Sequence, residues 1–377
     1  MTIPITKPLF GPEEQQAACE AIASGWVTQG PRVAEFEKAF AEYCGAKHAI
    51  ATANCTTALH LSLLAAGIGP GDEVICPSMS FIASANAIRH CGATPVFAEV
   101  REHDFNLDPD DILPRITERT KAILPVHQLG MPAEIDKICR IADKHGLIVV
   151  EDAACAIGSS YRSVKIGRPF GKFACFSFHP RKVITTGEGG MITTDDDDAE
   201  RLLRLLRQHG MSVPDTVRHR AREVIIESYV CVGYNYRMTD IQAAIGLEQL
   251  KRLDGMMADR QRLAERYNCA FADLPGVCVP QPPEYVVPNW QSYAVRLTDE
   301  MSVSRNELMQ RLLDQGIASR RGVMTIHREP AYADLCVGLE LPVTEAASDH
   351  SVILPMYPQM TDEEQEQVVS VVRKALT

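Results

Sequence analysis

The middle of the chain alternates short apolar runs with longer stretches of helical spacing. Apolar runs predict strands at residues 49–51, 74–76, 94–97, 122–126, 147–150, 173–178 and 191–194. The stretches with apolar residues three and four apart predict helices at 56–66, 81–91, 110–116, 135–145 and 197–208. Strands that alternate with helices of this length predict a mostly parallel sheet covered on both faces. Ligands of such sheets bind beyond the carboxyl ends of the strands.

The two flanks of this alternation have a different pattern. Residues 1–12 hold three prolines and predict an extended arm, which is followed by helices at 13–24 and 32–44. Residues 214–227 are polar and predict a surface segment. A helix begins at Thr239 and continues into a second helix that ends near residue 271. Prolines then cluster, and strands at 293–297, 317–319 and 350–354 combine with helices at 304–314 and 361–376. We therefore expect a large domain at 1–250 and a smaller α+β domain at 251–377.

Composition narrows the class of protein. The chain has 377 residues, of which 46% are hydrophobic and 23% are charged, as expected for a globular protein with a large core. The net charge of −11 argues against nucleic acid or an anionic membrane surface as the main partner. The 12 cysteines form no CxxC pair, which indicates reduced thiols in the cytoplasm. The N-terminal residues have no basic leader, and no run reaches the roughly 20 apolar residues that span a bilayer.

One lysine stands between two predicted strands. The first strand ends at Phe178, and Pro180 precedes Lys182, which is followed by a glycine-rich turn at 187–190. An isolated lysine beside a tight turn is most often a solvated residue. A lysine that is held in a pocket can instead lose its proton and attack a carbonyl, for which the aldehyde of pyridoxal 5′-phosphate (PLP) is the obvious candidate.

Other candidates for chemistry each allow a plainer interpretation. Thr56 and Thr57 open a helix, where backbone N–H groups and hydroxyls suit a phosphate or simply form an N-cap. Asp152 ends an apolar strand, where a carboxylate can pair with a pyridinium nitrogen or cap the next turn. Phe81 follows another strand and could stack on a flat ring or belong to the core.

The order of these signals is more specific than any one of them. Phosphate loop, aromatic residue, strand-end aspartate, and Ser-x4-Lys before Gly-Glu-Gly-Gly together resemble the fold type I PLP enzymes, and in detail the DegT-type (DegT/DnrJ/StrS) sugar aminotransferases. The resemblance covers nearly the whole chain. The matching segments are Ser24–Pro31, Pro125–His127, Glu151–Ala154, Ser177–Lys182 and Gly233–Asp240.

The resemblance implies an α/β fold and a role for each matching residue. The large domain would hold a mostly parallel seven-stranded sheet between helices, with the smaller C-terminal α+β domain beside it. Lys182 would form a Schiff base with PLP, Asp152 would pair with the pyridine nitrogen, and Phe81 would stack on the ring. The expected phosphate ligands are Thr56, Thr57, Ser177 and, from the other subunit of a homodimer, Asn235. Trp26, His327, Arg320 and Arg321 are candidates for substrate contact, and no metal is expected.

The implied reaction moves an amino group from an amino acid, commonly L-glutamate in this family, to a keto sugar, which we expect to be nucleotide-linked. Some relatives carry His in place of the lysine and act as dehydratases, so Lys182 favours transamination. One departure is Cys155, because many relatives have Gln at that position, near the ring hydroxyl of the cofactor. The alternatives are an aminocyclitol or other keto-cyclitol aminotransferase and a PLP-binding regulator without turnover. The intact pair of Lys182 and Asp152 argues against the regulator.

Overall fold

The large domain is built on a mixed seven-stranded sheet. The computed structural model describes residues 2–213, 217–218, 221–298 and 300–376, so residues 214–216, 219 and 220 of the predicted polar segment lie outside the described part. The strands lie in the order β1 (His48–Thr52), β9 (Gly190–Thr194), β8 (Phe173–Ser177), β5 (Ile148–Asp152), β4 (Thr120–Ile123), β2 (Glu73–Pro77) and β3 (Thr94–Ala98). Only β9 runs against its neighbours, because it returns from β8 as the second arm of a hairpin. The predicted mostly parallel sheet is confirmed.

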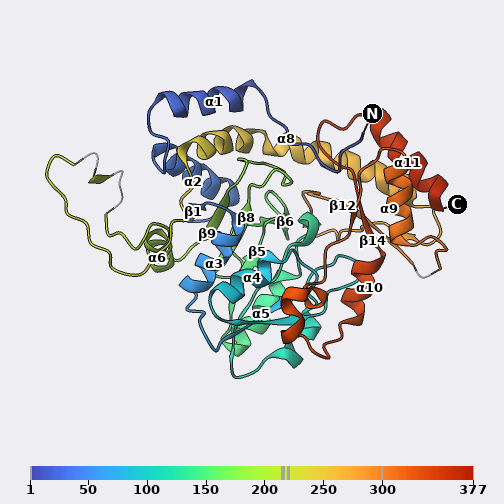
Figure 1. Ribbon diagram of the computed structural model, residues 1–377, viewed down its shortest axis with the longest axis horizontal. Coiled ribbons are helices and arrows are strands. Elements are labelled where there is room, and N and C mark those ends of the chain that lie inside the picture. Colours follow the sequence, from blue (N-terminus) through green and yellow to red (C-terminus); the bar gives the residue numbers. More distant parts are fainter. Residues whose placement is uncertain (1, 214–216, 219–220, 299, 377) are drawn as a thin grey trace.

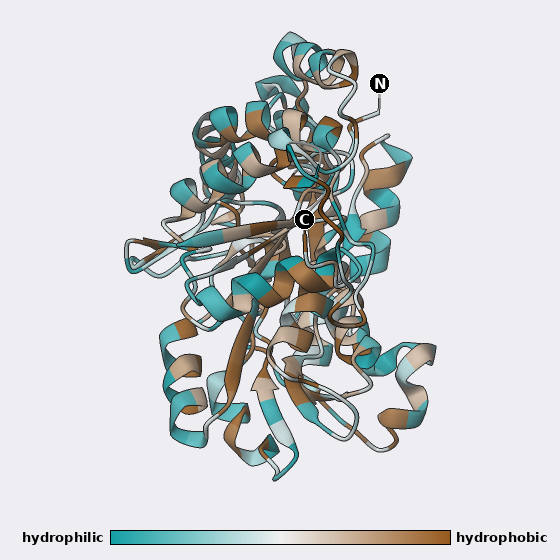
Figure 2. Cartoon of the chain, turned by 90° about the vertical axis from the view of Figure 1, so that its left-hand side faces the viewer, coloured by the Kyte–Doolittle hydropathy of each residue, from teal (hydrophilic) through white to brown (hydrophobic). Residues whose placement is uncertain are grey.

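Helices cover both faces of this sheet (Figure 1). One face packs against α2 (Pro31–Cys44), α5 (Ile135–His145) and α8 (Asp240–Phe271). The other face packs against α3 (Cys55–Ala65), α4 (Ala83–His90) and α6 (Asp197–Arg207). In β1, Ala49 and Ala51 belong to the first core and Ile50 to the second, which is the period of two that a strand imposes. Figure 2 shows hydrophobic strands inside and helices with polar outer faces.

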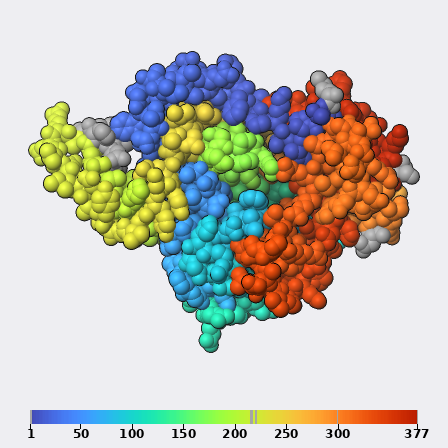
Figure 3. Space-filling model, viewed as in Figure 1, coloured from blue at the N-terminus to red at the C-terminus, as the bar shows by residue number. Residues whose placement is uncertain are grey.

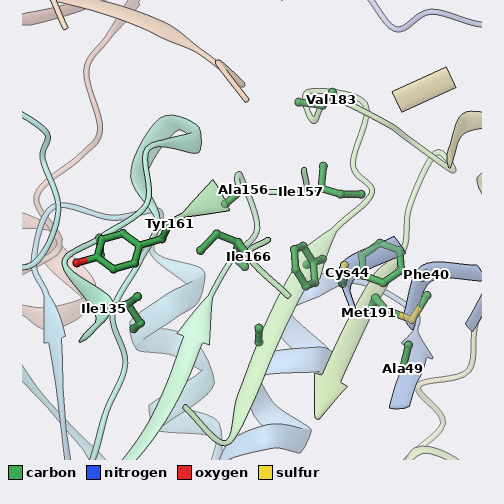
Figure 4. Close-up of a cluster of buried hydrophobic side chains, with 14 of the residues drawn as sticks. Phe40, Cys44, Ala49, Ile135, Ala156, Ile157, Tyr161, Ile166, Val183 and Met191 are labelled. Carbon is green, nitrogen blue, oxygen red and sulfur yellow. The ribbon is translucent and has the colours of Figure 1, made fainter. Parts of the chain in front are cut away.

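Aromatic side chains fill the core between α2 and the sheet. Phe40 of α2 lies edge-on to Phe176 of β8, with ring centroids 5.0 Å apart. Phe40 and Met191 lie beside Ala49 in Figure 4, where β1, β8 and β9 meet. Gly246 lets α8 approach this layer, because a Cβ atom there would lie 2.7 Å from the ring of Phe36. Helix α1 (Pro12–Ala23) packs on the outer side of α8.

The smaller domain contains a four-stranded antiparallel sheet. Its strands lie in the order β10 (Val277–Cys278), β12 (Tyr293–Leu297), β14 (Ser351–Leu354) and β13 (Arg320–Arg321). Its helices are α9 (Arg305–Asp314), α10 (Pro342–His350) and α11 (Asp362–Leu376). The N-terminal arm joins this domain through Ile3, whose N–H donates to the carbonyl of Gly316 over 2.9 Å. The boundary expected at 250/251 falls inside α8, which is one continuous helix through Phe271.

Several short elements differ from the sequence-based expectations. The helix expected at 110–116 is two 3₁₀ turns, η1 (Pro109–Asp111) and η2 (Leu113–Arg115), because Pro109 and Pro114 interrupt regular hydrogen bonding. The strand expected at 317–319 begins three residues later, as β13, and Ile317 forms only an isolated bridge with Ile3. Helix α10 was not predicted. Further short elements are β6 (Ser160–Tyr161), β7 (Val164–Lys165), β11 (Val286–Val287), η3 (Gln128–Gly130), η4 (Ile326–Arg328) and η5 (Pro330–Leu335).

A segment beside α6 stands away from the body of the molecule (Figure 3). We call residues 221–233 the protruding segment. Among the described residues, no helix is both long and apolar enough to cross a membrane.

Candidate active site

Lys182 lies in the loop between β8 and β9, at the carboxyl edge of the parallel strands. Its backbone N–H donates to the carbonyl of His179 over 2.8 Å, which closes a turn after Pro180. The side chain is half-buried, and Nζ lies 3.1 Å from Sγ of Cys155. Burial lowers the pKa of Lys182, but the neighbouring groups of Cys155, Cys55 and Asp152 outweigh it and raise the pKa. The lysine is therefore held in a polar pocket and is not a solvated residue.

Asp152 is the buried last residue of β5, and both of its carboxylate oxygens accept hydrogen bonds. Oδ1 accepts from the N–H of Ala154 over 3.1 Å, and Oδ2 accepts from the hydroxyl of Ser84 over 2.7 Å. The hydroxyl of Ser80 lies 2.7 Å from that of Ser84 and extends this series of hydrogen bonds. Burial raises the pKa of Asp152 against the opposing effects of these hydrogen bonds and of the Lys182 charge. A cation beside Asp152 would offset this cost of burying the carboxylate.

The N-terminus of α3 lies beside Ser177. Gly190 pairs with Thr52 on one side and with Ser177 on the other, so it stands between β1 and β8. A Cβ atom on Gly190 would lie 2.5 Å from the carbonyl of Asn54, so only glycine allows this approach. The first N–H groups of a helix have no partner within it and suit an anion.

The two threonines of this helix start are not equivalent. Asn54 accepts from the N–H of Thr57 over 2.9 Å, and the Thr57 hydroxyl donates to the Asn54 carbonyl over 2.7 Å. Thr57 thus completes a capping box, whereas Thr56 is half-buried at the first turn of the helix. Of the two interpretations made from the sequence, the N-cap is present, and the same helix start has the geometry for a phosphate.

Phe81 is not part of the core, because 67% of its surface is exposed. Its carbonyl accepts from the N–H of Ser84 over 3.1 Å, and the hydroxyl of Ser84 binds Asp152. The aromatic residue therefore lies on the turn that carries the partner of Asp152, with its surface available to a ligand.

Two of the matching segments contact each other through Asp240. Its buried carboxylate accepts from the N–H of Gly30 over 2.7 Å and from that of Val33 over 3.0 Å. Trp26 belongs to the same loop as Gly30, and its indole N–H donates to the carbonyl of Gln29 over 3.0 Å. Asn235 is exposed and pairs with Gln208 as an isolated bridge at the base of the protruding segment. The loop of Trp26 and the segment of Asn235 thus lie near each other within one chain.

His327 joins the two domains. Its Nδ1 lies 2.6 Å from the hydroxyl of Ser78, and its Nε2 lies 2.9 Å from Oε1 of Glu345. Because the backbone N–H of His327 also donates to Ser78, the Ser78 hydroxyl is free to donate to Nδ1. His327 is buried and has both ring nitrogens engaged, so direct contact with a substrate requires a change of partner.

The two arginines named from the sequence lie on β13, exposed at the edge of the small domain. Arg321 pairs with Glu329 at 3.2 Å. Burial and the nearby guanidinium of Arg181 lower the pKa of Arg320. Arg320 and Arg181, from different domains, thus place two positive charges near each other. Arg181 directly precedes Lys182 in the sequence.

Sequence reasoning missed three parts of the site. Ser84 had no motif, although its spacing of four from Ser80 at the start of a helix could have drawn attention to the pair. Asn289 gave no signal, but its side-chain amide donates to the carbonyls of Cys155 over 2.8 Å and Ile157 over 2.7 Å. The sequence also gave no indication that Cys155 contacts Lys182.

These residues fit a PLP cofactor. The site offers an amine for its aldehyde, a buried carboxylate that needs a cation, an exposed aromatic ring, and a helix N-terminus for its phosphate. Within the described ranges, no group of three or more His, Cys, Asp and Glu side chains could hold a metal ion. On a sheet of this topology, such a site defines a PLP-dependent enzyme of fold type I.

Comparison with known proteins identifies the family. Residues 8–373 match the model of the DegT/DnrJ/EryC1/StrS aminotransferase family, and the chain belongs to this family. It is 43% identical over 378 residues to GDP-perosamine synthase of Caulobacter vibrioides, which covers 99% of this chain and 98% of that protein. It is 40% identical over 375 residues to the spore coat polysaccharide biosynthesis protein SpsC of Bacillus subtilis. This match covers 98% of this chain and 96% of that protein.

Solved structures of this family agree with the fold and the cofactor. The PLP form of Spr1654 from Streptococcus pneumoniae superposes with a TM-score of 0.91 and 29% identity, with 100% of each chain covered. The chain is therefore a PLP-dependent aminotransferase of the sugar aminotransferase family.

Proposed function

We propose that the protein transfers an amino group from L-glutamate to a keto sugar that is linked to a nucleotide, in the biosynthesis of an amino sugar. The observation that carries the proposal is the placement of buried Asp152 and half-buried Lys182 at the carboxyl edge of the sheet, where the charge of each group acts on the other. A protein that only binds PLP has no need of a carboxylate placed to keep the pyridine nitrogen charged.

Each residue of the site has a defined task in this proposal. Bound PLP supplies an electron sink for the charge that develops on the α-carbon of the amino donor. Lys182 would hold the cofactor through its amine, and its free Nζ would take the proton from that α-carbon as a general base. Asp152, fixed by Ser84 and Ala154, would keep the pyridine nitrogen protonated. Phe81 would offer its exposed ring to the cofactor.

The phosphate of the cofactor has its own ligands in the proposal. Thr56, Thr57 and Ser177 bind it at the N-terminus of α3. A dianion needs several such donors because the chain as a whole carries a net charge of −11.

The second substrate is proposed from chemistry and from the relatives. The name of the relative GDP-perosamine synthase refers to a sugar linked to a nucleotide. A nucleotide-linked sugar of this kind would bring a diphosphate to the site. Arg320 and Arg181 offer two cations at the boundary between the domains for such a diphosphate. Arg321, His327 and Trp26 complete the candidates for substrate contact.

We propose that the active protein is a homodimer in which Asn235 completes the neighbouring site. The protruding segment exposes 92% of Val224, 88% of Ile226 and 89% of Val232, in a chain whose other large apolar residues are mostly buried. Exposed apolar side chains grouped on one segment are typical of an interface. Asn235 lies two residues after this segment and is exposed, so a second copy that covers the segment would meet it.

We also place the protein in the cytoplasm. All twelve cysteines lie in the described part of the chain and are free thiols, as expected in a reducing compartment. The acidic net charge argues against nucleic acid and membrane surfaces as partners.

A spectroscopic experiment tests the proposal. L-glutamate added to the purified, yellow holoenzyme should bleach its absorbance, and a nucleotide-linked 3- or 4-keto sugar should restore it with formation of the amino sugar. Free keto-cyclitols serve as the competing substrates in the same assay. Bleaching by glutamate with recovery only on a keto-cyclitol would reject the nucleotide-sugar assignment, and the absence of any bleaching would reject glutamate as the donor.

A further inference from the structure

The contact between Cys155 and Lys182 brings a second nucleophile next to the lysine. Sγ lies 3.1 Å from Nζ, within the distance of a hydrogen bond to sulfur. Both backbones are fixed: Asn289 donates to the carbonyl of Cys155 over 2.8 Å, and Lys182 donates to His179 over 2.8 Å. The two side chains therefore meet because the fold holds them together, and not through a chance encounter on the surface.

Cys155 is also the reachable cysteine of this pocket. Cys55 and Cys175 are both buried, and burial raises the pKa of each, which keeps them as unreactive thiols. Cys155 is only half-buried, so a small oxidant can reach it. The thiolate is the form of cysteine that reacts with peroxides.

We propose that hydrogen peroxide converts this pair into a covalent Cys155–Lys182 cross-link with a sulfur–nitrogen bond. In the first step, the sulfur of Cys155 bonds to one peroxide oxygen and the O–O bond breaks. The released hydroxide takes the thiol proton and departs as water, so that Cys155 becomes a sulfenic acid. In the second step, Nζ of Lys182 attacks that sulfur, the S–N bond forms, the S–O bond breaks, and a second water leaves. Sulfur is oxidised by two electrons and peroxide is reduced to water, so the linked chain is two hydrogen atoms lighter.

The cross-link would switch the enzyme off reversibly. In the proposed function, on which this consequence rests, the amine of Lys182 must bond the cofactor. The cross-link occupies that amine. A cofactor bound to Lys182 would protect Cys155 and Lys182 from cross-linking. The pair would be most susceptible to peroxide whenever Lys182 is free of the cofactor. Excess thiol would attack the sulfur, release the amine, and return Cys155 through a mixed disulfide.

Mass spectrometry of the full-length chain tests the inference. The protein, freed of cofactor, is treated with a small excess of hydrogen peroxide, digested without reducing agent, and searched for a peptide pair that joins Cys155 to Lys182. We expect that pair to form, to disappear after treatment with dithiothreitol, and to be absent from Cys155→Ser. A Lys182→Ala variant should accumulate oxidised Cys155 without a cross-link. The matched control, Cys19→Ser, changes an exposed thiol on α1 and should cross-link as fully as the wild type.

Three outcomes would overturn the inference: a disulfide between Cys155 and Cys55, sulfinic acid on Cys155 with Lys182 unmodified, or no reaction at Cys155. The same digest after borohydride reduction of the holoenzyme shows which lysine bonds the cofactor. Labelled Lys182 without a cross-link in the cofactor-free protein rejects the oxidation chemistry and leaves the proposed function intact. A cross-link together with a cofactor label on Lys165 or Lys172 rejects the assigned role of Lys182 and leaves the oxidation chemistry intact.

Discussion

Two regions of the molecule differ in how their side chains are contacted. One is the floor of the active site, formed by Asp152, Lys182 and Cys155, and the other is the protruding segment. At the floor, Asp152 has both oxygens hydrogen-bonded, and Lys182 is in contact with Cys155. In the protruding segment, residues 221–233, most large apolar side chains are exposed. A few backbone hydrogen bonds connect the C-terminal part of the segment to the rest of the chain, such as that from the N–H of Val230 to the carbonyl of Gly210 over 2.9 Å. The contacts of the floor are made within one chain, whereas the segment leaves most of its large apolar side chains exposed among the described residues.

This difference divides the site into two kinds of parts. Residues on the strand ends are set by the core of one chain and should respond to substitution whatever the oligomeric state. Residues on the protruding segment should act only when a second copy is present. Five experiments, taken from the largest expected effect to the smallest, test this division.

Lys182→Ala should have the largest effect, because it removes both the amine that bonds the cofactor and the proposed general base. We expect turnover to fall by ~10⁴-fold or more, while the free energy of unfolding stays nearly unchanged. Steady-state kinetics and thermal unfolding measure the two quantities. Lys165→Ala is the matched control, since Lys165 lies over the ring of Tyr43, and it should keep its activity. Substantial turnover by Lys182→Ala would contradict the assignment.

Asp152→Asn should reduce turnover by about a hundredfold, because ~3 kcal/mol of stabilisation of the developing charge is lost with the carboxylate. The amide keeps the size of the side chain and one hydrogen-bond acceptor, so we expect the fold to be preserved. The measurement is kcat at saturating donor, with circular dichroism as the check on folding. Near-normal turnover would show that Asp152 is only a structural cap. Asp196→Asn, on the surface, is the control.

Mixing two damaged proteins tests whether Asn235 acts across the dimer. Lys182→Ala and Asn235→Ala are unfolded, mixed and refolded, and then assayed at limiting PLP. A mixed dimer has one site that pairs intact Lys182 with intact Asn235, so recovery should approach about a quarter of the wild-type activity for random pairing.

The control for this experiment is a mixture of two proteins that are both Lys182→Ala, which has no intact site. If mixed dimers form, as shown by mass spectrometry, but activity does not return, Asn235 acts within its own chain. That result would break the division between floor and protruding segment.

Val224→Ser combined with Ile226→Ser should weaken the dimer, because both side chains are exposed in one chain and would be buried by a partner. Loss of a few kcal/mol of apolar burial should raise the dissociation constant by roughly a hundredfold. Analytical ultracentrifugation across a range of concentrations measures it. Val337→Ser is the control, since Val337 is 86% exposed elsewhere on the chain. An unchanged dissociation constant would remove the protruding segment from the interface.

Ser84→Ala should have the smallest effect. It removes one hydrogen bond of 2.7 Å to Asp152, which costs about 1.5 kcal/mol when the acceptor is charged, or roughly tenfold in rate. The readout is the pH profile of kcat. The loss of kcat should grow as the pH rises, because the pyridine nitrogen then becomes harder to protonate. Ser84→Thr keeps the hydroxyl and should restore the wild-type profile, whereas equal profiles for Ala and Thr would show that the hydrogen bond does not position Asp152.

The sequence predicted the large domain well because its signals are local. Each strand of the sheet is a short apolar run, and four of the seven are followed by an α-helix. Strand β9 was recognised because Met191 begins a second run after the glycine-rich turn. The placement of Asp152 at the end of β5 and of Lys182 in the β8–β9 loop followed directly from those strands. The roles assigned to these residues stay predictions until they are measured.

The errors come from contacts that no short window of sequence contains. Helix α10 escaped notice because only one of its three buried residues, Ala347, is apolar, so they form no apolar stripe. Thr344 and Ala347 pack against the other domain. Ser84 became part of the site only when α4 and β5 were brought together. Asn289 reaches Cys155 across more than a hundred residues of sequence, which composition and periodicity do not encode.

Helix α8 has a mechanical consequence. Gln242 in its first turn donates to the carbonyl of Glu188, in the turn that follows Lys182, over 2.7 Å. Phe271 at its other end lies in the core of the small domain. A helix of 32 residues is about 48 Å long and bends little, so it works as a rigid lever between the two places. A substrate that tilts the small domain would therefore move the loop that carries the lysine, with no hinge in between to absorb the motion.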